Sequence, residues 1–366
     1  VAGKHGGGAR LARAPAFAAE AAVPGTKLAA PRGSMNDIAR YLEGRTLILL
    51  SNREPYEHVR TARGIEARQP AGGLVTALDP TMQRTDGVWV AWGSGSADRE
   101  TADADSRLRV PPEAASYTLR RVWLTADDVE GYYLGFANTA LWPLCHMLVQ
   151  HFEFQTEQWT RYQVVNARFA EALADEVRRA STQRGEPIVW IQDYHFALVA
   201  HMLREQCPTA FIHQFWHIPF PPADILRFLP INVYTALLRG MLGNDLLEFH
   251  TERYALNFLS CVEQKLPEAD VDMRTRTVRY RGRTVHVGAF PISIDFQQYE
   301  SLALAPRGER LVRDLRDRYA RGGTRQLGVS VDRVDYTKGI PERLRALELV
   351  WTQHPELRGC FSFLLV

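Results

Sequence analysis

The sequence has few of the features that mark several common protein classes. It contains four cysteines, and no two of them form a CxxC pair, which argues against a zinc site and against a disulfide scaffold. The formal net charge is only +2, without the basic excess that is typical of nucleic-acid-binding proteins. No apolar run approaches the ~18 residues that a membrane-spanning helix needs. These absences predict a protein of a reducing cytoplasm that has neither a nucleic acid nor a membrane as partner.

Residues 1–34 differ in composition from the rest of the chain. They are rich in Ala and Gly and contain one acidic residue, Glu20. The apolar residues are mostly Ala, which does not form the core of a signal peptide. We predict a disordered tail or the remnant of an expression junction, with Met35 as a candidate start, and a transit peptide is the weaker alternative.

From residue 45 onward, short apolar runs alternate with helical patterns, as in α/β proteins. Most of the runs are apolar on both faces, as buried parallel strands are. They span residues 46–50, 87–92, 120–124, 187–192, 210–216, 245–249 and 284–290. Apolar residues four apart, from Val165 to Val177, form a helical stripe, and residues 195–207 and 252–264 behave similarly. The pattern predicts an α/β fold with a doubly wound sheet.

A domain boundary is expected near residues 292–306, where the periodicity weakens. A second strand–helix–strand unit follows at 326–331, 341–353 and 360–366. About 60 residues bury too little surface to be stable alone. We therefore predict an N-terminal Rossmann-like domain over 35–295 and an incomplete C-terminal domain over 296–366.

Two cations lie where a predicted strand gives way to a helix. Arg333 and Lys338 flank a polar loop, Gly339 permits close approach of the backbone, and Pro341 suits the first turn of a helix. Ligands bind at this edge of open α/β sheets, and the two cations could hold a diphosphate. A solvated loop with ordinary ion pairs is the alternative.

Three further segments offer polar groups after apolar runs. Arg53 follows the first run, and Gly72 and Gly73 precede an apolar helix start that could face a phosphate. Asp193 follows the run at 187–192, where it could bind a sugar hydroxyl or cap the next helix. His217 ends another run before a proline-rich loop. Each also has a purely structural reading.

An aromatic cluster occurs in "GYYLGFANTALWPLCH", residues 131–146. Tyr132, Tyr133 and Trp142 could stack on a sugar face beside Asn138. Ordinary core packing is the alternative reading.

Taken in order, these segments resemble the trehalose-6-phosphate synthase family of retaining glycosyltransferases. The matching segments are Arg53, "AGGL", "WVAWGS", "GYYLGFANTALWP", "IQDYH", "HIPFP", "DLLEFHTERYALNFL" and "DRVDYTKGIPERL". The resemblance runs from about residue 45 to Val366. It implies the GT-B architecture of two Rossmann-like domains, the second incomplete here because the family's chains continue past this point.

The resemblance also implies roles for individual residues. The predicted donor-binding residues are Gly72, Gly73, His217, Arg333 and Lys338. The predicted acceptor-binding residues are Arg53, Trp92, Tyr133, Trp142 and Asp193. The predicted catalytic residues are Asp193, His217, Arg333 and Lys338. No metal or cofactor is expected; a nucleotide sugar, UDP-glucose in the first instance, is a substrate.

The function implied is transfer of glucose from a nucleotide-glucose donor to glucose 6-phosphate, which forms trehalose 6-phosphate. Two alternatives stay open: a related transferase that uses glycerol 3-phosphate, and a non-catalytic homologue that binds sugar phosphates. The expected partners are these small molecules, with a homo-oligomer allowed. Retention of the configuration at the anomeric carbon would follow either from a covalent intermediate or from attack on the same face, in which the leaving phosphate takes the acceptor's proton.

Overall fold

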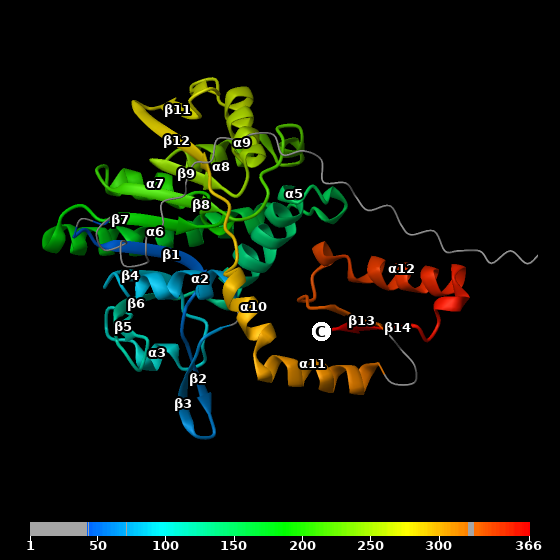
Figure 1. Ribbon diagram of the computed structural model, residues 1–366. Coiled ribbons are helices and arrows are strands. Elements are labelled where there is room, and N and C mark those ends of the chain that lie inside the picture. Colours follow the sequence, from blue (N-terminus) through cyan, green and yellow to red (C-terminus); the bar gives the residue numbers. More distant parts are fainter. Residues whose placement is uncertain (1–41, 43, 71, 321–325) are drawn as a thin grey trace, which may run out of the picture. The chain divides into compact units, whose positions relative to one another are not determined.

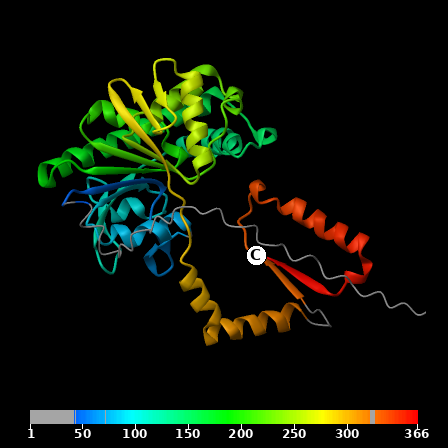
Figure 2. The same cartoon turned by 45° about the horizontal axis from the view of Figure 1, so that its top comes forward.

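A ten-stranded sheet is the largest element of the computed structural model, and Figures 1 and 2 show it from two directions. The structure describes residues 42–320 and 326–366, except residues 43 and 71. The predicted tail, residues 1–34, lies outside them. The strand order is β10-β11-β12-β9-β8-β7-β1-β4-β6-β5. The bounds are β1 Leu47–Arg53, β4 Val88–Trp92, β5 Arg107–Val110, β6 Tyr117–Val122, β7 Ile188–Gln192, β8 Phe211–Trp216, β9 Leu246–Phe249, β10 Asp270–Asp272, β11 Thr277–Tyr280 and β12 Arg283–Ala289.

Neighbouring strands from β12 to β6 in this order run parallel. Alternate residues of β1 explain why the sheet is covered on both faces. Ile48 and Leu50 belong to one apolar cluster, whereas Leu47 and Leu49 belong to another. A strand that is apolar on both faces can be buried only between two layers, which confirms the predicted doubly wound α/β arrangement.

The helices supply these two layers. Helix α2 contributes Val75, Leu78 and Met82 to the cluster that contains Leu47 and Leu49. Helices α6 to α9 contribute to the other cluster. Their bounds and those of the shorter helices are α2 Gly73–Met82, α3 Asp98–Thr101, α4 Ala126–Asp128, η2 Val129–Leu141, α5 Trp142–Cys145, η3 Val149–His151, α6 Thr156–Arg184, η4 Tyr194–Phe196, α7 Val199–Gln206, η5 Ile225–Phe228, α8 Ile231–Met241 and α9 Glu252–Lys265.

Several strands at the periphery were not predicted from the sequence. Strands β2 (Glu57–Thr61) and β3 (Gly64–Arg68) form an antiparallel hairpin between β1 and α2. Strand β5 pairs antiparallel with β6, and β10 and β11 extend the sheet antiparallel beyond β12. These strands are short and carry many polar residues, so they lack the apolar run that indicates a buried strand.

The segment after β12 contains two helices and a small strand–helix–strand unit. Helices α10 (Phe296–Leu304) and α11 (Pro306–Tyr319) precede β13 (Gln326–Ser330), η6 (Tyr336–Lys338), α12 (Ile340–Gln353), η7 (Pro355–Leu357) and β14 (Phe361–Leu365). Strands β13 and β14 pair in parallel, as the predicted unit requires. The predicted division of the chain at residues 295 and 296 stays a prediction.

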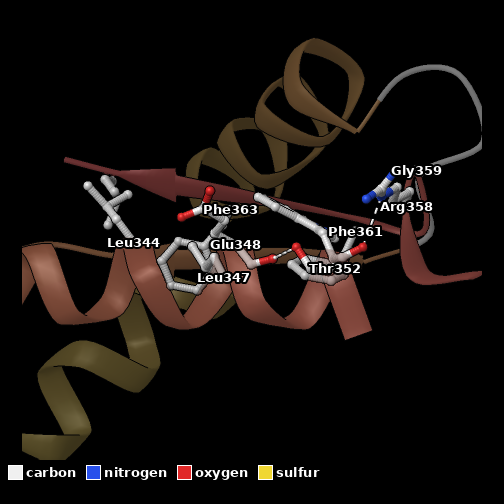
Figure 3. Close-up of a pocket in the computed structure, with 10 residues that line it drawn as sticks. Leu344, Leu347, Glu348, Thr352, Arg358, Gly359, Phe361 and Phe363 are labelled. Atoms are coloured by element: carbon white, nitrogen blue, oxygen red, sulfur yellow. Dashed lines mark hydrogen bonds between the residues drawn. The ribbon is translucent and has the colours of Figure 1, made fainter. Parts of the chain in front are cut away.

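This C-terminal unit has an open apolar groove of about 630 Å³. Figure 3 shows Leu344 and Leu347 of α12 beside Phe361 and Phe363 of β14. Leu344 remains 49% exposed, so the helix does not fully cover the two strands. A two-stranded sheet with one helix has too few partners to bury its apolar surface.

Cysteine and hydropathy predictions can be checked against the described residues. All four cysteines are free, with Cys360 exposed and the other three buried. Among the residues with a described position, no helix combines the length and the apolar composition that crossing a bilayer requires.

Candidate functional site at the carboxyl edge of the sheet

The order in which the chain adds strands to the sheet reverses at β1: β4 and β6 lie on one side of it, and β7, β8 and β9 on the other. Strand β1 pairs with β4 on one side and with β7 on the other. Loops that follow two such strands leave in opposite directions and open a crevice at their carboxyl ends. Arg53 ends β1, and Asp193 directly follows β7. The topology therefore places two of the predicted site residues at the switch point.

Arg53 offers an exposed guanidinium at this crevice. The register of β1 against β4 shifts between Ser51 and Arg53, and the Ser51 hydroxyl donates to the Arg53 carbonyl at 2.6 Å. The Trp89 indole donates to the Ser51 hydroxyl at 2.8 Å. The Arg53 guanidinium donates to the Tyr133 hydroxyl at 3.3 Å. The backbone of Arg53 is thus held firmly, while most of its side-chain donors face the crevice.

Aromatic rings line the crevice beside Arg53. The Tyr133 ring stacks on His195 with centroids 5.7 Å apart and lies 6.2 Å from Trp92. Tyr133 comes from η2, a π-helix whose close packing against α6 depends on glycine. A Cβ at Gly131 would lie 2.6 Å from Arg161 Cγ. The "GYYLGF" segment therefore has glycine where two helices approach and aromatic residues where the site opens.

Asp193 has a strained backbone and a tightly held carboxylate. Its φ is +74°, in a region that non-glycine residues rarely adopt. Its Oδ1 atom accepts from the backbone N–H groups of Tyr194 at 2.9 Å and His217 at 3.1 Å. Burial raises the pKa of Asp193 to about 7, although backbone N–H groups including that of Ile218 favour the charged form. Strain together with an altered pKa is typical of a functional carboxylate. The capping alternative also holds, because the bond to Tyr194 caps η4.

His217 follows β8 and is oriented by a neighbour from β7. Its Nε2 atom lies 2.9 Å from the Gln192 side-chain oxygen, which accepts only. This contact assigns the proton to Nε2 and leaves Nδ1 as an acceptor. Burial, followed by the nearby His250, lowers the pKa of His217 to about 4, so the ring is neutral at pH 7.

Gly72 and Gly73 begin α2 at the same edge. No side chain caps this helix, and a Cβ built at either glycine meets nothing within 4 Å. The φ of Gly72 is 170°, which any residue can adopt. Neither packing nor backbone conformation requires glycine here, so the empty space is available to a ligand near free N–H groups.

The β13–α12 loop places its two cations differently. Arg333 pairs with Asp335 at 2.8 Å, and its guanidinium carbon lies 5.3 Å from the centre of the Trp142 ring. Lys338 is exposed at the end of η6. Gly339 follows with φ +60° as the N-cap of α12. The loop is therefore the predicted strand-to-helix turn, but of its two cations only Arg333 contributes to the cavity described next.

These groups surround one cavity of about 750 Å³. Of the ten predicted site residues, seven line it: Arg53, Gly72, Gly73, Tyr133, Trp142, Asp193 and Arg333. The other three are Trp92, which packs on Tyr133, His217, which contacts Gln192 and Asp193, and Lys338. The structure thus brings most of the predicted donor and acceptor residues to one place, and their roles stay predictions.

The cavity also includes Asn138, which was considered beside the aromatic cluster, and polar residues that were not predicted as site residues. The latter are Asn52, Gln192, Tyr194, His195, Asp335 and Tyr336. The side-chain nitrogens of Asn52 and Gln192 and the Nδ1 of His195 are buried without a hydrogen-bond partner in the described chain. Burial, followed by the Arg53 charge, lowers the pKa of His195 to about 3. Asn52 and Gln192 directly precede Arg53 and Asp193, and a polar pair at a strand's end was the available signal.

No three His, Cys, Asp or Glu side chains within the described ranges form a group that could hold a metal ion. The polar atoms of the cavity are instead guanidinium, amide, hydroxyl, imidazole and carboxylate groups. Such a set suits an anionic, polyhydroxylated ligand, because it combines charge-assisted bonds for the anion with neutral bonds for hydroxyls.

Comparisons with known proteins place this site in a family. Residues 45–366 match the model described as glycosyltransferase family 20. A trehalose-6-phosphate synthase of Mycolicibacterium vanbaalenii is 39% identical over 310 residues, which are 83% of this chain and 60% of the relative. The chain therefore spans less than two thirds of that relative's length.

Solved structures share the fold. A UDP-forming alpha,alpha-trehalose-phosphate synthase from Burkholderia xenovorans, in complex with glucose-6-phosphate, is 26% identical with a TM-score of 0.66, over 87% of this chain and 65% of that one. An E. coli structure with UDP-2-fluoro glucose bound is 28% identical with a TM-score of 0.68, over 87% and 64%. This likeness confirms the predicted GT-B type of fold over the part that the chain covers. Because the family model matches well over half of its residues, the chain belongs to glycosyltransferase family 20.

Proposed function

We propose that this chain provides the acceptor site, and part of the donor site, of a retaining glucosyltransferase that makes trehalose 6-phosphate from a nucleotide-glucose and glucose 6-phosphate. The observation that carries the proposal is the single cavity shared by Arg53, Tyr133, Asp193, Gly72 and Arg333. The family relatives named above support it, since the one from Burkholderia xenovorans is described with glucose-6-phosphate.

Arg53 would bind the phosphate of the acceptor. Its guanidinium lines the cavity and, among the residues that the structure describes, makes one weak hydrogen bond, of 3.3 Å to the Tyr133 hydroxyl. The neighbouring His195 is neutral at pH 7, because its lowered pKa of about 3 keeps the proton off. Arg53 would therefore be the cation on this side of the cavity, and the Tyr133 hydroxyl would add a second contact to the phosphate.

Amide groups would bind the sugar hydroxyls. The side-chain nitrogens of Asn52 and Gln192 are buried without partners, and an unsatisfied buried donor costs ~1–3 kcal/mol. A hydroxyl of the bound sugar would satisfy each of them. The carboxylate of Asp193 would accept a bond from another hydroxyl. A hexose phosphate reaches more of these groups than glycerol 3-phosphate does, which favours glucose 6-phosphate as the acceptor.

The donor would bind at the opposite side of the cavity. The uncapped N-terminus of α2 behind Gly72 and Gly73 attracts a phosphate through its free N–H groups and the helix dipole. Arg333 would neutralise the charge that develops on the leaving diphosphate, and the exposed Lys338 would assist once the loop closes on the donor. The Nδ1 atom of His217 would accept a hydrogen bond from a sugar hydroxyl of the donor.

Same-face attack is the route that we propose for retention. The carboxylates that line the cavity are Asp193 and Asp335. Asp193 is held by backbone N–H groups, and Asp335 is paired with Arg333. Neither is free to act as a nucleophile, so the leaving phosphate would take the acceptor's proton. Positioning and electrostatics would then supply most of the rate enhancement, without a metal or cofactor.

Calorimetric titration of this chain with glucose 6-phosphate and with glycerol 3-phosphate tests the acceptor site. We expect glucose 6-phosphate to bind at least ~10-fold more tightly, because each additional hydroxyl bond contributes ~1 kcal/mol. Nucleotide release from UDP-, ADP- or GDP-glucose with each acceptor tests the reaction. Absence of binding by either phosphate would reject the proposed site, and a preference for glycerol 3-phosphate would reject the proposed acceptor.

A further inference from the structure

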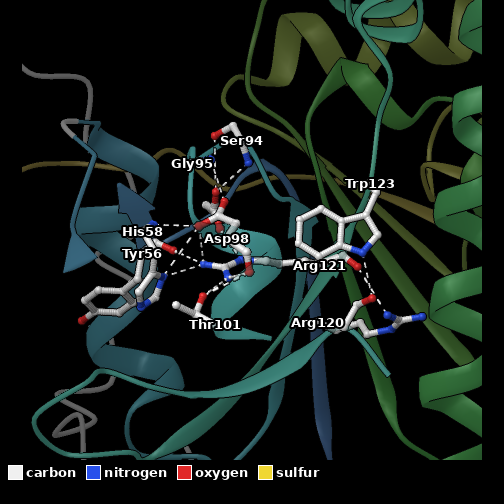
Figure 4. Close-up of polar contacts among 11 residues, drawn as sticks. Tyr56, His58, Ser94, Gly95, Asp98, Thr101, Arg120, Arg121 and Trp123 are labelled. Atoms are coloured by element: carbon white, nitrogen blue, oxygen red, sulfur yellow. Dashed lines mark hydrogen bonds and ion pairs between the residues drawn. The ribbon is translucent and has the colours of Figure 1, made fainter. Parts of the chain in front are cut away.

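A buried ion cluster adjoins Arg53 and Trp92, because its member Glu54 directly follows Arg53 and bonds to Ser94, two residues after Trp92. Its centre is Arg121 of β6, which is 1% exposed. Two carboxylates face it, those of Glu54 and Asp98, and both residues are almost fully buried. Figure 4 shows Arg121 with Asp98, His58, Tyr56 and Thr101 around its guanidinium. A buried arginine requires a full set of acceptors, and this one has it.

Each guanidinium nitrogen of Arg121 has a partner from a different segment. Nε donates to Glu54 at 2.8 Å, and Nη1 donates to the Asp98 carbonyl and the Thr101 hydroxyl, both at 2.9 Å. Nη2 donates to the Tyr56 carbonyl at 3.0 Å and contacts His58 Nδ1 at 2.8 Å. Because a guanidinium only donates, His58 Nδ1 accepts, and the ring carries its proton on Nε2.

The two carboxylates join three segments around this centre. Glu54 follows Arg53 and accepts from the Ser94 backbone N–H at 2.9 Å, which ties the end of β1 to the loop after β4. Asp98 accepts from the backbone N–H groups of His58 at 2.7 Å and Gly95 at 2.6 Å. It thereby ties that loop to the β2–β3 hairpin, which precedes Gly72 and Gly73 in the chain.

Glycines after Trp92 are required by the same cluster. A Cβ at Gly93 would lie 2.5 Å from the Trp123 ring and 3.1 Å from Arg121 Cδ. A Cβ at Gly95 would lie 2.5 Å from the His58 carbonyl oxygen and 2.7 Å from Asp98 Oδ1. The "WGSGSAD" segment, residues 92–98, thus has the residues that allow close approach to Arg121.

The charges of the cluster balance without using Arg53. Burial, then a hydrogen bond to Asp98, raises the pKa of Glu54 to about 8. Burial opposes ionisation of Asp98, but hydrogen bonds from His58 and Glu54 and the charge of Arg121 hold its pKa well below the usual value. At pH 7 a protonated Glu54, an ionised Asp98 and the Arg121 cation therefore sum to zero. The positive charge of Arg53 stays available to a ligand.

We propose that Arg121, acting through Glu54, is a positioning residue that holds Arg53 and Trp92 in place for the phosphate of the acceptor. The proposal rests on the proposed function, since it assumes that Arg53 binds that phosphate. Arg121 and Glu54 do not line the cavity and would not touch the ligand. Their removal would leave every ligand contact present but less well oriented, and binding depends steeply on such orientation.

Glucose 6-phosphate titrations of the whole chain, followed by calorimetry well below the unfolding temperature, test the proposal. Glu54→Ala removes the tie to Ser94, and Glu54→Gln keeps its shape and one acceptor. Glu176→Ala is the matched control, because Glu176 is 2% exposed and faces Arg107 and Arg120 away from the cavity. We expect about a tenfold or larger loss of affinity for Glu54→Ala, less than about threefold for Glu54→Gln, and no change for Glu176→Ala.

The affinity for glucose 6-phosphate measured over a pH series adds a test whose result general destabilisation of the fold would not change. The titratable or charged groups that contact Glu54 are Asp98 of α3 and Arg121 of β6, and His58 of β2 contacts both of these. Ionisation of Glu54 as the pH rises through 8 adds a negative charge beside Arg53. Between pH 7 and pH 9.5 the affinity of wild type should fall by about threefold or more beyond any fall shown by Glu54→Gln, because the ionisation of Asp193, with a pKa of about 7, is common to both proteins.

The outcomes separate the two proposals. If wild type binds glucose 6-phosphate and Glu54→Ala binds it equally well, the positioning role is rejected and the acceptor site stands. If Glu176→Ala weakens binding as much as Glu54→Ala does, the effect is general destabilisation and the positioning role is again rejected. If wild type does not bind glucose 6-phosphate at all, the proposed function fails, and the role assigned to Arg121 fails with it.

Discussion

Asp193→Asn should make the protein more stable above neutral pH and weaken ligand binding. The wild-type carboxylate sits at the cavity with φ +74° and a pKa raised by burial from 3.8 to about 7. Asparagine has the same shape as aspartate and cannot ionise. Its side-chain oxygen can accept the same bonds from the N–H groups of Tyr194 and His217.

The sign and size of this effect follow from the pKa. Between about pH 4 and pH 7 the unfolded chain has lost the Asp193 proton while the folded chain retains it, so the free energy of unfolding falls as the pH rises through this window. A shift from 3.8 to about 7 corresponds to roughly 4 kcal/mol. Because the side chain is partly open to the cavity, screening by water reduces this to ~1–2 kcal/mol.

Urea unfolding of wild type and Asp193→Asn at pH 5 and pH 8 measures the difference. We expect a smaller difference at pH 5, which lies about one unit inside this window, and a variant that is ~1–2 kcal/mol more stable at pH 8, with glucose 6-phosphate affinity reduced about tenfold. Other titrating groups are common to both proteins and cancel in the comparison. A variant that is less stable at pH 8, or a difference that does not depend on pH, would refute the reasoning that burial outweighs the backbone hydrogen bonds.

Three further experiments test other parts of the structure. Arg53→Met should weaken glucose 6-phosphate binding by ~10–100-fold in calorimetry, the range for a lost charge-assisted bond, and equal affinity would remove Arg53 from the acceptor site. Gly240→Ala should lower the free energy of unfolding by ~2 kcal/mol or more in urea titration, because its Cβ would lie 2.2 Å from the Ala197 carbonyl oxygen, whereas Gly73→Ala, with nothing within 4 Å, should cost much less. Arg333→Ala, made in a protein of full family length, should lower turnover in a nucleotide-release assay by ~100-fold or more, and wild-type turnover would contradict its role at the leaving diphosphate.

Most of the central sheet could be predicted from the sequence because its strands are buried on both faces. The runs that became β1, β4 and β9 are buried almost without alternation, which leaves few other structures for them, whereas β12 alternates buried and exposed residues. The β2–β3 hairpin could not be predicted in this way. Strand β3 is largely exposed and β2 is only partly buried, so neither has an apolar run. The place of the hairpin depends on contacts such as the bond between His58 and Asp98, which are far apart in sequence.

The candidate site was predictable to the extent that it follows strand ends. Arg53 and Asp193 end or follow buried strands, and the parallel arrangement brings such ends together. Asn52 and Gln192 were overlooked, because an amide next to a charged residue at a strand's end is only a weak signal in a single sequence. Arg121 was overlooked as well, since only the fold shows that a cation within β6 is enclosed by Glu54 and Asp98.

What the sequence determined by itself was the alternation of strand and helix, and hence the edge of the sheet at which polar residues collect, because the local pattern of apolar residues decides which face of each element is buried. The tertiary structure alone decided which of those polar residues share a cavity. Arg333 lies against Trp142 and lines the cavity, whereas Lys338, five residues later, does not line it. That difference depends on contacts between segments distant in the chain, and local pattern carries no information about them.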